Sequence, residues 1–539
     1  MPAALRAPAV ALALLAVFGA AGCERTGPDT AQGEVLLRRG NAGEPDSLDP
    51  QRSEEAFSRQ IIRDLYDGLV DEGADGELVP RAARDWTVSA DGLVWTFRLR
   101  EDARWSNGDP VTAEDFVAGL RRAVDPAIAS TSGGLLAPLA GAGPIIRGEA
   151  PPESLGVRAV GEHELELRLD APTPYLPGLL SSTFTYPVHR PSLAAWDGDF
   201  ARAGRLVSNG PYRLAEWTLH ARIRLERNPH YAEPPPIGTV VYYPTEDAVA
   251  ELNRYRAGEL DLTAQIPHTR FRWVKEHLAD ELHVAPYLST QFWMFNLRSP
   301  PLDDVRVRRA LTMAVDRERL TELVTGLGEA PAYGLVPPGV ANYRPQSFSW
   351  RDMPAEERVA EALALLATAG YGPERPLAIE VRYNTDENLR RVATAVASMW
   401  RESLGVEATL LNEELRVMLA RRKQPTQWQV MRLSWVGDYN DASNFLEILA
   451  TAGAVSDTGF ADPEFERLLD EAAGESDPGH RAALLEAAER IVLSQYPVLP
   501  LYFTVSKHLV KPWVRGFHGN VLNHVDTRYL SVDTDARGF

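Results

Sequence analysis

The sequence of 539 residues contains one cysteine, Cys23, which excludes an internal disulfide bond, so packing must stabilise the fold. The eleven histidines form neither an H-E-x-x-H pair nor a Cys/His cluster, and we expect no metal site. G-x-S-x-G, G-x-x-x-x-G-K-[ST] and G-x-G-x-x-G motifs are also missing. The missing motifs argue only weakly against an enzyme, because a catalytic site assembled from distant residues leaves no such motif. We expect no cofactor, no catalytic residues and a protein that is not an enzyme.

A basic stripe is missing as well. Acidic residues outnumber basic ones by 75 to 56, the formal net charge is −19, and the arginines and lysines are scattered along the chain. Nucleic acid is therefore not expected as a partner. Hydrophobic residues make up 45% of the chain and charged residues 24%, which is typical of ordinary globular proteins, and the length requires more than one hydrophobic core.

The N-terminus has the features of a signal peptide. Arg6 precedes an uncharged run over residues 7–22, which ends in the small residues Ala-Ala-Gly directly before Cys23. The run is too short for a membrane-spanning helix. We interpret residues 1–22 as a signal peptide and residues 23–33 as a lipidated cysteine and flexible tether, because the arrangement resembles a bacterial lipoprotein signal. The alternative is a plain secretory leader, which would leave the protein soluble in the periplasm.

Hydrophobic periodicity predicts both strands and helices. Residues 92–100 and 222–228 alternate apolar and polar side chains, the pattern of half-buried strands. Residues 304–326 and 354–370 repeat apolar residues at helical spacing and end in glycine. The mixture indicates an α/β architecture.

Five segments, spread over most of the chain, are similar to the solute-binding proteins of peptide ABC importers, the oligopeptide-binding family. They are EPDSLDP (44–50), LYDGLV (65–70), WTFRLREDARWSNGDPVTAEDF (95–116), SNGPYRL (208–214) and FNLRSPPLDDVRVRRAL (295–311). Two further stretches, RLSWVGDYNDASNFL (432–446) and LYFTVSKHLVKPWVRGF (501–517), resemble the oligopeptide-binding subgroup in particular.

The resemblance implies a two-lobed periplasmic-binding-protein fold of type II with an extra domain in the N-terminal lobe, three domains in all. Domain I would combine residues 34–66, 190–290 and 506–535, domain II would span 67–189, and domain III would span 291–505. The ligand would be enclosed when the lobes close about a hinge.

The same resemblance assigns residues to the two ends of a peptide ligand. Asp438 stands where the subgroup pairs an aspartate with the terminal ammonium, a role that a charge-assisted hydrogen bond suits. Arg432 resembles the residue that meets the carboxylate of short peptides, and a guanidinium can bind that group through two hydrogen bonds. Lys423 occupies another basic position, where it would act as a point charge or as an ordinary solvated residue.

Other candidates would contact the backbone or the side chains of the ligand. Glu54, Glu55 and Ala56 occur where the subgroup lays a short strand against the peptide, which supplies affinity without reading side chains. Aromatic residues could line side-chain pockets or could belong to the core; these are Phe292, Trp293, Trp435 and Phe503. Tyrosines of the subgroup are replaced here, which implies a more apolar pocket wall.

We therefore expect a monomeric binding protein on the periplasmic side of the cell envelope, attached to the membrane only through lipid at Cys23. It would capture short peptides and deliver them to the permease subunits of an ABC importer. The alternatives are a receptor for cell-wall peptide or another small solute, an exported peptidase, and a chaperone-like receptor for unfolded chains.

Overall fold

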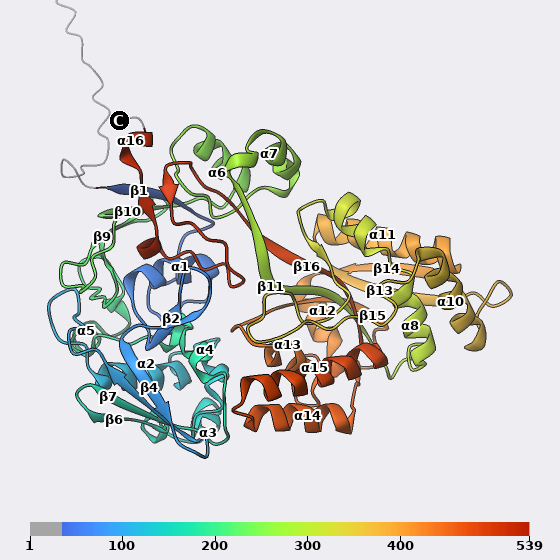
Figure 1. Cartoon of the computed structure of the whole chain (residues 1–539), viewed down its shortest axis with the longest axis horizontal. Helices are drawn as coiled ribbons and strands as arrows, with labels where there is room; N and C mark the ends of the chain where they lie inside the picture. Colours follow the sequence, from blue (N-terminus) through green and yellow to red (C-terminus); the bar gives the residue numbers. More distant parts are fainter. Residues whose placement is uncertain (1–34, 538–539) are drawn as a thin grey trace, which may run out of the picture. The chain divides into compact units, whose positions relative to one another are not determined.

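The computed structural model describes residues 35–537 (Figure 1). The predicted signal peptide, Cys23 and the tether lie outside these residues. Within them, no helix combines the length and the apolar character needed to cross a membrane.

Two four-stranded sheets lie in the N-terminal half of the chain. The first has the order β1(Leu36–Asn41)-β10(Thr239–Pro244)-β9(Arg222–Arg227)-β8(Tyr212–Thr218), with β1 parallel to β10. The second is antiparallel, with the order β4(Ala83–Val88)-β5(Val94–Leu99)-β7(Glu164–Arg168)-β6(Val157–Gly161). A short pair, β2(Val70–Glu72) and β3(Leu78–Pro80), connects the first helix to the second sheet. The strands predicted at 92–100 and 222–228 are confirmed as β5 and β9.

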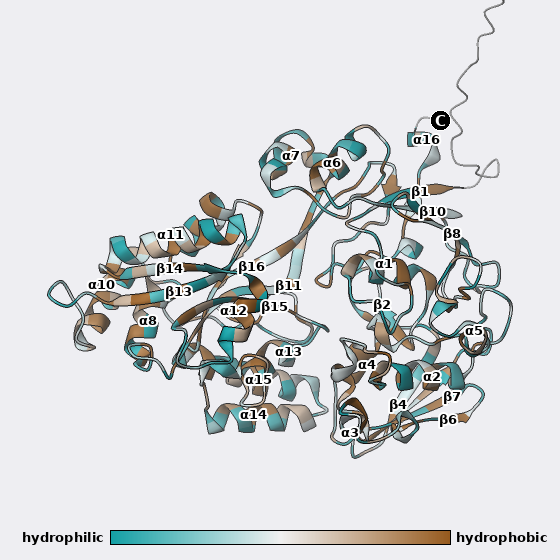
Figure 2. Cartoon of the chain, turned by 180° about the vertical axis from the view of Figure 1, so that it is seen from behind, coloured by the Kyte–Doolittle hydropathy of each residue, from teal (hydrophilic) through white to brown (hydrophobic). Residues whose placement is uncertain are grey.

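The helices of this half pack mainly around these sheets. Helix α2 contacts β6 and β7 of the second sheet, and α3 and α4 consist mainly of apolar residues (Figure 2). The helices are α1(Ala56–Leu65), α2(Ala113–Val124), α3(Ala142–Ile146), α4(Leu176–Leu180), α5(Arg190–Trp196), α6(Ala248–Arg256) and α7(Phe271–His277).

A mixed six-stranded sheet forms the centre of the C-terminal half. Its order is β12(Ala330–Pro331)-β16(Val498–Leu509)-β11(Leu282–Phe295)-β15(Val430–Val436)-β13(Ala378–Asn384)-β14(Glu407–Glu413). Strands β11 and β16 are long and antiparallel, and they run from the neighbourhood of α6 and α7 into this sheet (Figure 1). A break in their register lies between Pro286 and Thr290. A last short pair, β17(Val514–Arg515) and β18(Ser531–Val532), lies near the C-terminus.

Both faces of the six-stranded sheet are covered. One core cluster contains Trp293 and Phe295, and another contains Phe292 and Met294, because successive residues of β11 point to opposite faces. The helices of this half are α8(Val305–Met313), α9(Arg317–Arg319), α10(Ala355–Thr368), α11(Glu387–Leu404), α12(Leu415–Arg422), α13(Ser443–Leu446), α14(Pro463–Gly474), α15(Pro478–Gln495) and, at the chain's end, α16(Thr534–Arg537).

One predicted helix is confirmed, and the other is divided into two parts in the structure. Residues 354–370 contain α10, and Gly370 follows it at φ +87°, in the left-handed region that glycine tolerates. The expected single helix over 304–326 is interrupted between Met313 and Arg317. Its second part begins because the Asp316 side chain accepts a hydrogen bond from the backbone N–H of Arg319 at 2.9 Å, and it continues as a π-helical turn over Leu320–Thr325.

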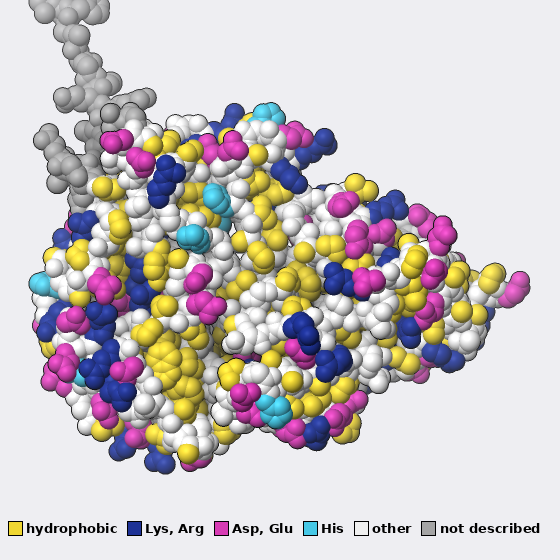
Figure 3. All heavy atoms as spheres, viewed as in Figure 1, with side chains coloured by type: hydrophobic (Ala, Val, Ile, Leu, Met, Phe, Trp, Pro, Cys, Tyr) yellow, Lys and Arg dark blue, Asp and Glu magenta, His cyan; other side chains and the backbone are white. Residues whose placement is uncertain are grey.

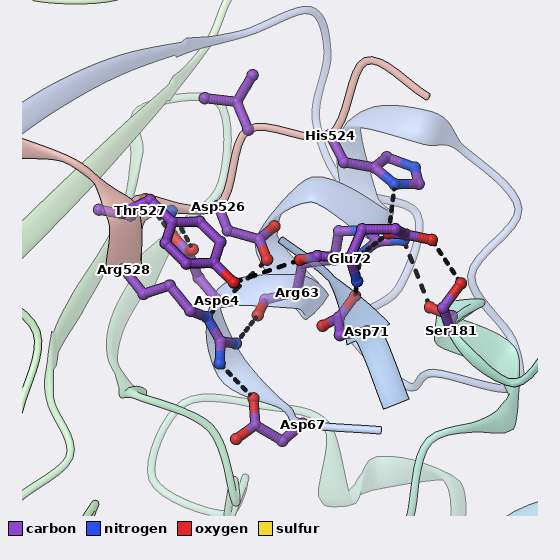
Figure 4. A network of polar contacts seen from close by, with 12 residues as sticks. Arg63, Asp64, Asp67, Asp71, Glu72, Ser181, His524, Asp526, Thr527 and Arg528 are labelled. Atoms are coloured by element: carbon purple, nitrogen blue, oxygen red, sulfur yellow. Dashed lines mark hydrogen bonds and ion pairs between the residues drawn. The ribbon is translucent and has the colours of Figure 1, made fainter. Parts of the chain in front are cut away.

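A buried polar network fastens the C-terminal segment to α1 and β2 (Figure 4). Arg63 of α1 pairs with Asp71 at 2.5 Å and with Glu72 at 2.9 Å, and His524 lies 2.9 Å from Glu72. Both carboxylate oxygens of Asp526 are buried without a hydrogen-bond partner. Burial, and then the nearby Asp71, raise the pKa of Asp526 to about 7. The network holds Arg63, Asp64, Asp67, Asp71, Glu72, Ser181, His524, Asp526, Thr527 and Arg528.

Candidate functional site

Strand β15 presents Arg432 among polar side chains of the neighbouring strands. Its Nη2 donates to Gln291 Oε1 at 2.6 Å and to Ser434 Oγ at 3.2 Å, and its Nη1 donates to Asn384 Oδ1 at 3.1 Å. Gln291 lies on β11, and Asn384 is the last residue of β13, which runs parallel to β15. Three adjacent strands therefore hold the guanidinium in one position.

The positive charge of Arg432 has no acidic counterpart. Among residues 35–537, no carboxylate forms an ion pair with it, and its Nε is buried without a hydrogen-bond partner. Burial lowers the pKa of the guanidinium, although Tyr502 and Asp386 oppose this shift. A half-buried cation held by neutral groups can bind an incoming carboxylate, because no carboxylate of the described residues is within ion-pair distance of it.

Asp438 lies in the loop after β15, where its side chain reaches solvent. Its backbone N–H donates to Asn444 Oδ1 at 3.3 Å, and the Asn444 side chain also hydrogen-bonds its carboxylate. Loss of hydration in these surroundings raises the pKa of the carboxyl group, while Asn444 and then Arg59 of α1 oppose the rise. No basic side chain of the described residues forms an ion pair with Asp438, so a cationic ligand group can approach it.

Two of the four aromatic candidates, Trp435 and Phe503, keep some exposure. Trp435 is half-buried on β15, and its indole N–H donates to Asn444 Oδ1 at 2.8 Å, the same atom that accepts from the Asp438 backbone. Phe503 of β16 is 9% exposed and lies between Thr290 of β11 and Ala330 of β12.

The structure places Phe292 and Trp293 in the core instead. They are 0% and 1% exposed, and they belong to the clusters on opposite faces of the six-stranded sheet. The Trp293 ring packs edge-to-face against Trp400 at 5.5 Å. Both residues are buried because helices and loops cover both faces of this sheet, so alternation along β11 leaves neither side chain at the surface. Neither is kept as a ligand contact.

The segment expected to pair with a peptide backbone is exposed. Glu54 and Glu55 are extended and belong to no strand of the described sheets, whereas Ala56 is already the first residue of α1. Glu54 is held by its backbone N–H, which donates to Asp46 Oδ2 at 2.9 Å, and by its carbonyl oxygen, which accepts from Arg59 at 3.0 Å. The short strand expected at 54–56 is therefore not formed in this structure, because α1 begins at Ala56.

Lys423 lies apart from these residues. It is exposed at the C-terminal end of α12 and lines a surface pocket together with Arg298, Arg422, Asp457 and Phe460. None of the other candidate residues lines this pocket.

Sequence reasoning missed the neutral partners of Arg432. Gln291 and Asn384 are 141 and 48 residues away from it in sequence, so no local motif connects them. One signal was available for Asn384, because polar side chains at the carboxyl ends of parallel strands often mark a ligand site. Arg59, which lies close enough to Asp438 to influence its pKa, gave no sequence signal.

The described residues contain no group of three or more His, Cys, Asp and Glu side chains arranged to hold a metal ion. On the face shown in Figure 3, basic and acidic side chains are interspersed.

A separate pocket is lined from both halves of the chain, by Tyr175 and Pro177 on one side and by Tyr439, Asp441 and Arg481 on the other. Ligand sites often lie between two such regions, so two sheet-centred regions connected by long strands, with a pocket lined from both, are typical of a protein that binds a small solute.

Comparison with known proteins identifies the family. Residues 77–457 match the model of the bacterial extracellular solute-binding proteins, family 5, and the chain belongs to this family. It is thus an extracytoplasmic binding protein rather than an enzyme, and the resemblance noted in the sequence is confirmed.

The periplasmic oligopeptide-binding protein OppA of Escherichia coli is 37% identical over 515 residues, which cover 94% of each chain. Among solved structures, the unliganded open form of the periplasmic murein tripeptide binding protein MppA has a TM-score of 0.86 at 35% identity, covering 93% of this chain and 98% of that one. Haemophilus influenzae OppA in complex with RPPGFSPFR has a TM-score of 0.73 at 32% identity, covering 93% of this chain and 100% of that one. The predicted α/β periplasmic-binding-protein fold is confirmed.

Proposed function

We propose that this protein captures a short peptide and delivers it to the permease of an ABC importer. The observation that carries the proposal is the pair of unpaired charges on one strand and its loop, Arg432 for the carboxylate and Asp438 for the ammonium of the ligand. The similarity to oligopeptide-binding proteins supports the same ligand class.

The spacing of these charges supports a short ligand. Asp438 comes six positions after Arg432, so their Cα atoms are at most about 20 Å apart in an extended chain. An extended peptide that reaches from one to the other therefore has at most about six residues. Affinity near 1 μM, about −8 kcal/mol, would be typical of such a ligand, whose end charges compensate their own desolvation.

Further contacts belong to the same proposal. Glu54, Glu55 and Ala56 would pair with the peptide main chain once Glu54 exchanges its present partners, Asp46 and Arg59, for the ligand. Trp435 and Phe503 would line side-chain pockets. Lys423 would contribute only a distant positive charge, because it is exposed outside the group around Arg432.

We propose domain closure as the means of capture. Domain I would combine residues 34–66, 190–290 and 506–535, a boundary that the pairing of β1 with β10 supports. Domain II would be 67–189, which contains the whole β4-β5-β7-β6 sheet, and domain III would be 291–505. The greater similarity to an unliganded open form than to a peptide complex suits a receptor that closes on its ligand.

Attachment to the membrane through lipid at Cys23 remains part of the proposal, with a monomeric protein held on the periplasmic side of the envelope. The support is the sequence alone, namely the leader of residues 1–22 and the single cysteine that follows it. Mass spectrometry of the membrane fraction tests this attachment. A lipidated protein would lack the leader and carry the mass of a lipid on Cys23. A mature protein without that mass would favour the soluble periplasmic alternative.

A second candidate is a cell-wall peptide, and the specific observation in its favour is that the periplasmic murein peptide-binding protein MppA of Escherichia coli is 37% identical over 490 residues, the same identity as for OppA. Such a ligand also carries charged ends. The two candidates separate in a direct comparison of affinities for an ordinary tripeptide and a murein tripeptide.

Native mass spectrometry of residues 24–539 mixed with di- to pentapeptides, their N-acetylated forms and a murein tripeptide tests the proposal. We expect one free-amine peptide per chain and much weaker retention of the acetylated forms. Binding of none of these peptides would overturn the ligand class and reopen the search among other small solutes, and cleavage of the peptides would indicate a peptidase.

A further inference from the structure

The loop that carries Asp438 also carries an aromatic residue that joins the opposite half of the molecule. Tyr439 is 6% exposed and belongs to a core cluster whose other buried members lie within residues 37–262 and 510–530. No other buried member of this described cluster comes from residues 291–505. Tyr439 therefore connects the end of β15 to the N-terminal half.

The connection is a stack of two tyrosine rings. Tyr175, directly before α4, lies parallel to Tyr439 with ring centroids 4.9 Å apart and an angle of 5° between the planes. On α4, a Cβ built on Gly178 would lie 3.8 Å from the Tyr439 Cβ, so the helix backbone approaches this residue closely. The guanidinium of Arg481 lies 5.8 Å from the centre of the Tyr175 ring.

The rest of this loop is fixed to the C-terminal half. Asp441 accepts from Arg481 at 2.6 and 2.9 Å, and Asn440 Oδ1 accepts from the backbone N–H of Ala341 at 3.0 Å. The backbone N–H of Gly437 donates to the Leu288 carbonyl oxygen at 2.8 Å, within the irregular part of β11. The stack at Tyr439 thus supplies the support that comes from the opposite half.

We propose that Tyr175 is a positioning residue for the amino end of the ligand, because its stack on Tyr439 fixes the loop that presents Asp438. The inference rests on the proposed peptide binding. A carboxylate presented in one fixed place binds an ammonium more tightly than a carboxylate on a loop that must first be ordered. Tyr175 itself need not touch the ligand.

Two variants and one control test this role. Tyr175→Leu removes the stack and keeps an apolar side chain, whereas Tyr175→Phe keeps the ring. The control is Tyr371→Leu, since Tyr371 is also half-buried with an arginine, Arg375, 5.0 Å from its ring centre.

The first readout needs no ligand. Amide hydrogen exchange in residues 437–441 should become faster in Tyr175→Leu, and it should stay at the wild-type rate in Tyr175→Phe and Tyr371→Leu. Unchanged exchange in Tyr175→Leu would overturn the inference, whatever the protein binds.

The second readout is affinity for one tripeptide and its N-acetylated form. Tyr175→Leu should weaken binding of the free-amine peptide about two- to tenfold, the range that an aromatic pair contributes, and leave the acetylated form unchanged. An equal loss for both peptides, or the same loss in Tyr175→Phe, would overturn it. If the wild-type protein binds no peptide while amide exchange is faster in Tyr175→Leu, the proposed function is wrong, but the role of Tyr175 in ordering the Asp438 loop is confirmed.

Discussion

Arg432 offers a test that separates a ligand-binding role from a structural one. Replacement of a buried arginine normally destabilises a protein, because its partners lose their hydrogen bonds. Around Arg432 these partners are the half-buried side chains of Gln291, Asn384 and Ser434, which water can reach once the arginine is gone, and no ion pair is broken. Arg432→Met also removes a half-buried positive charge whose pKa is already lowered by burial. We therefore expect the melting temperature of Arg432→Met to equal or exceed that of wild type.

The affinity of Arg432→Met for peptides should fall, although its stability does not. A hydrogen bond to a charged group contributes about 1.5 to 3 kcal/mol, so the affinity for a tripeptide with a free carboxylate should fall about 10- to 100-fold. The affinity for the C-terminally amidated peptide should change little, because no anion is lost. Isothermal titration calorimetry with both peptides measures this difference.

A matched control is Arg317→Met. Arg317 is fully buried and donates to the carbonyl oxygens of Ala332, Pro500, Thr312 and Val315 at 2.7 to 3.2 Å, so its loss should cost at least about 3 kcal/mol of unfolding free energy. If Arg432→Met instead loses stability like Arg317→Met, or weakens both peptides equally, Arg432 is a structural residue and the reasoning is refuted.

Three other predictions concern single residues. Asp438→Asn should reduce the affinity for free-amine peptides about tenfold. Because the pKa of Asp438 is raised, the affinity of the wild-type protein should fall on acidification at a higher pH than an ordinary aspartate would give. A calorimetric affinity that does not change with pH contradicts this. The raised pKa of Asp526, about 7 against 3.8, means that the folded state keeps a proton that the unfolded state loses, so this group lowers stability as pH rises from about 4 to 7. Asp526→Asn should therefore gain roughly 1 to 4 kcal/mol over wild type in urea unfolding at pH 8 and little at pH 4, whereas an equal effect at both pH values argues against a buried proton. Trp293→Ala should lose about 3 to 5 kcal/mol of unfolding free energy without altering the preference among peptides, and altered selectivity at unchanged stability would return Trp293 to the site.

Local patterns predicted the fold where neighbours in sequence decide the structure. The alternation at 92–100 and 222–228 predicted β5 and β9, and the apolar repeat before Gly370 predicted α10. The helix over 304–326 was expected to be continuous because its apolar repeat passes through Asp316, whose role as a new helix start depends on side-chain geometry. The order of the sheets came from the family resemblance and not from periodicity.

The site was predictable only in part, because its geometry joins distant strands. Arg432 and Asp438 followed from a motif, and their roles stay predictions. Gln291 and Asn384, which hold Arg432, and Arg59, which influences the pKa of Asp438, come from elsewhere in the chain. Aromatic composition alone could not separate Trp435, which is half-buried, from residues of β11 that are covered on both faces of the sheet.

A crystal structure of the protein with a bound tripeptide tests the central claim most directly. The account predicts that the peptide is enclosed beside β15, with its ammonium about 3 Å from the Asp438 carboxylate and its carboxylate hydrogen-bonded to the Arg432 guanidinium. A peptide bound in the reverse direction, or one that contacts neither residue, would contradict it.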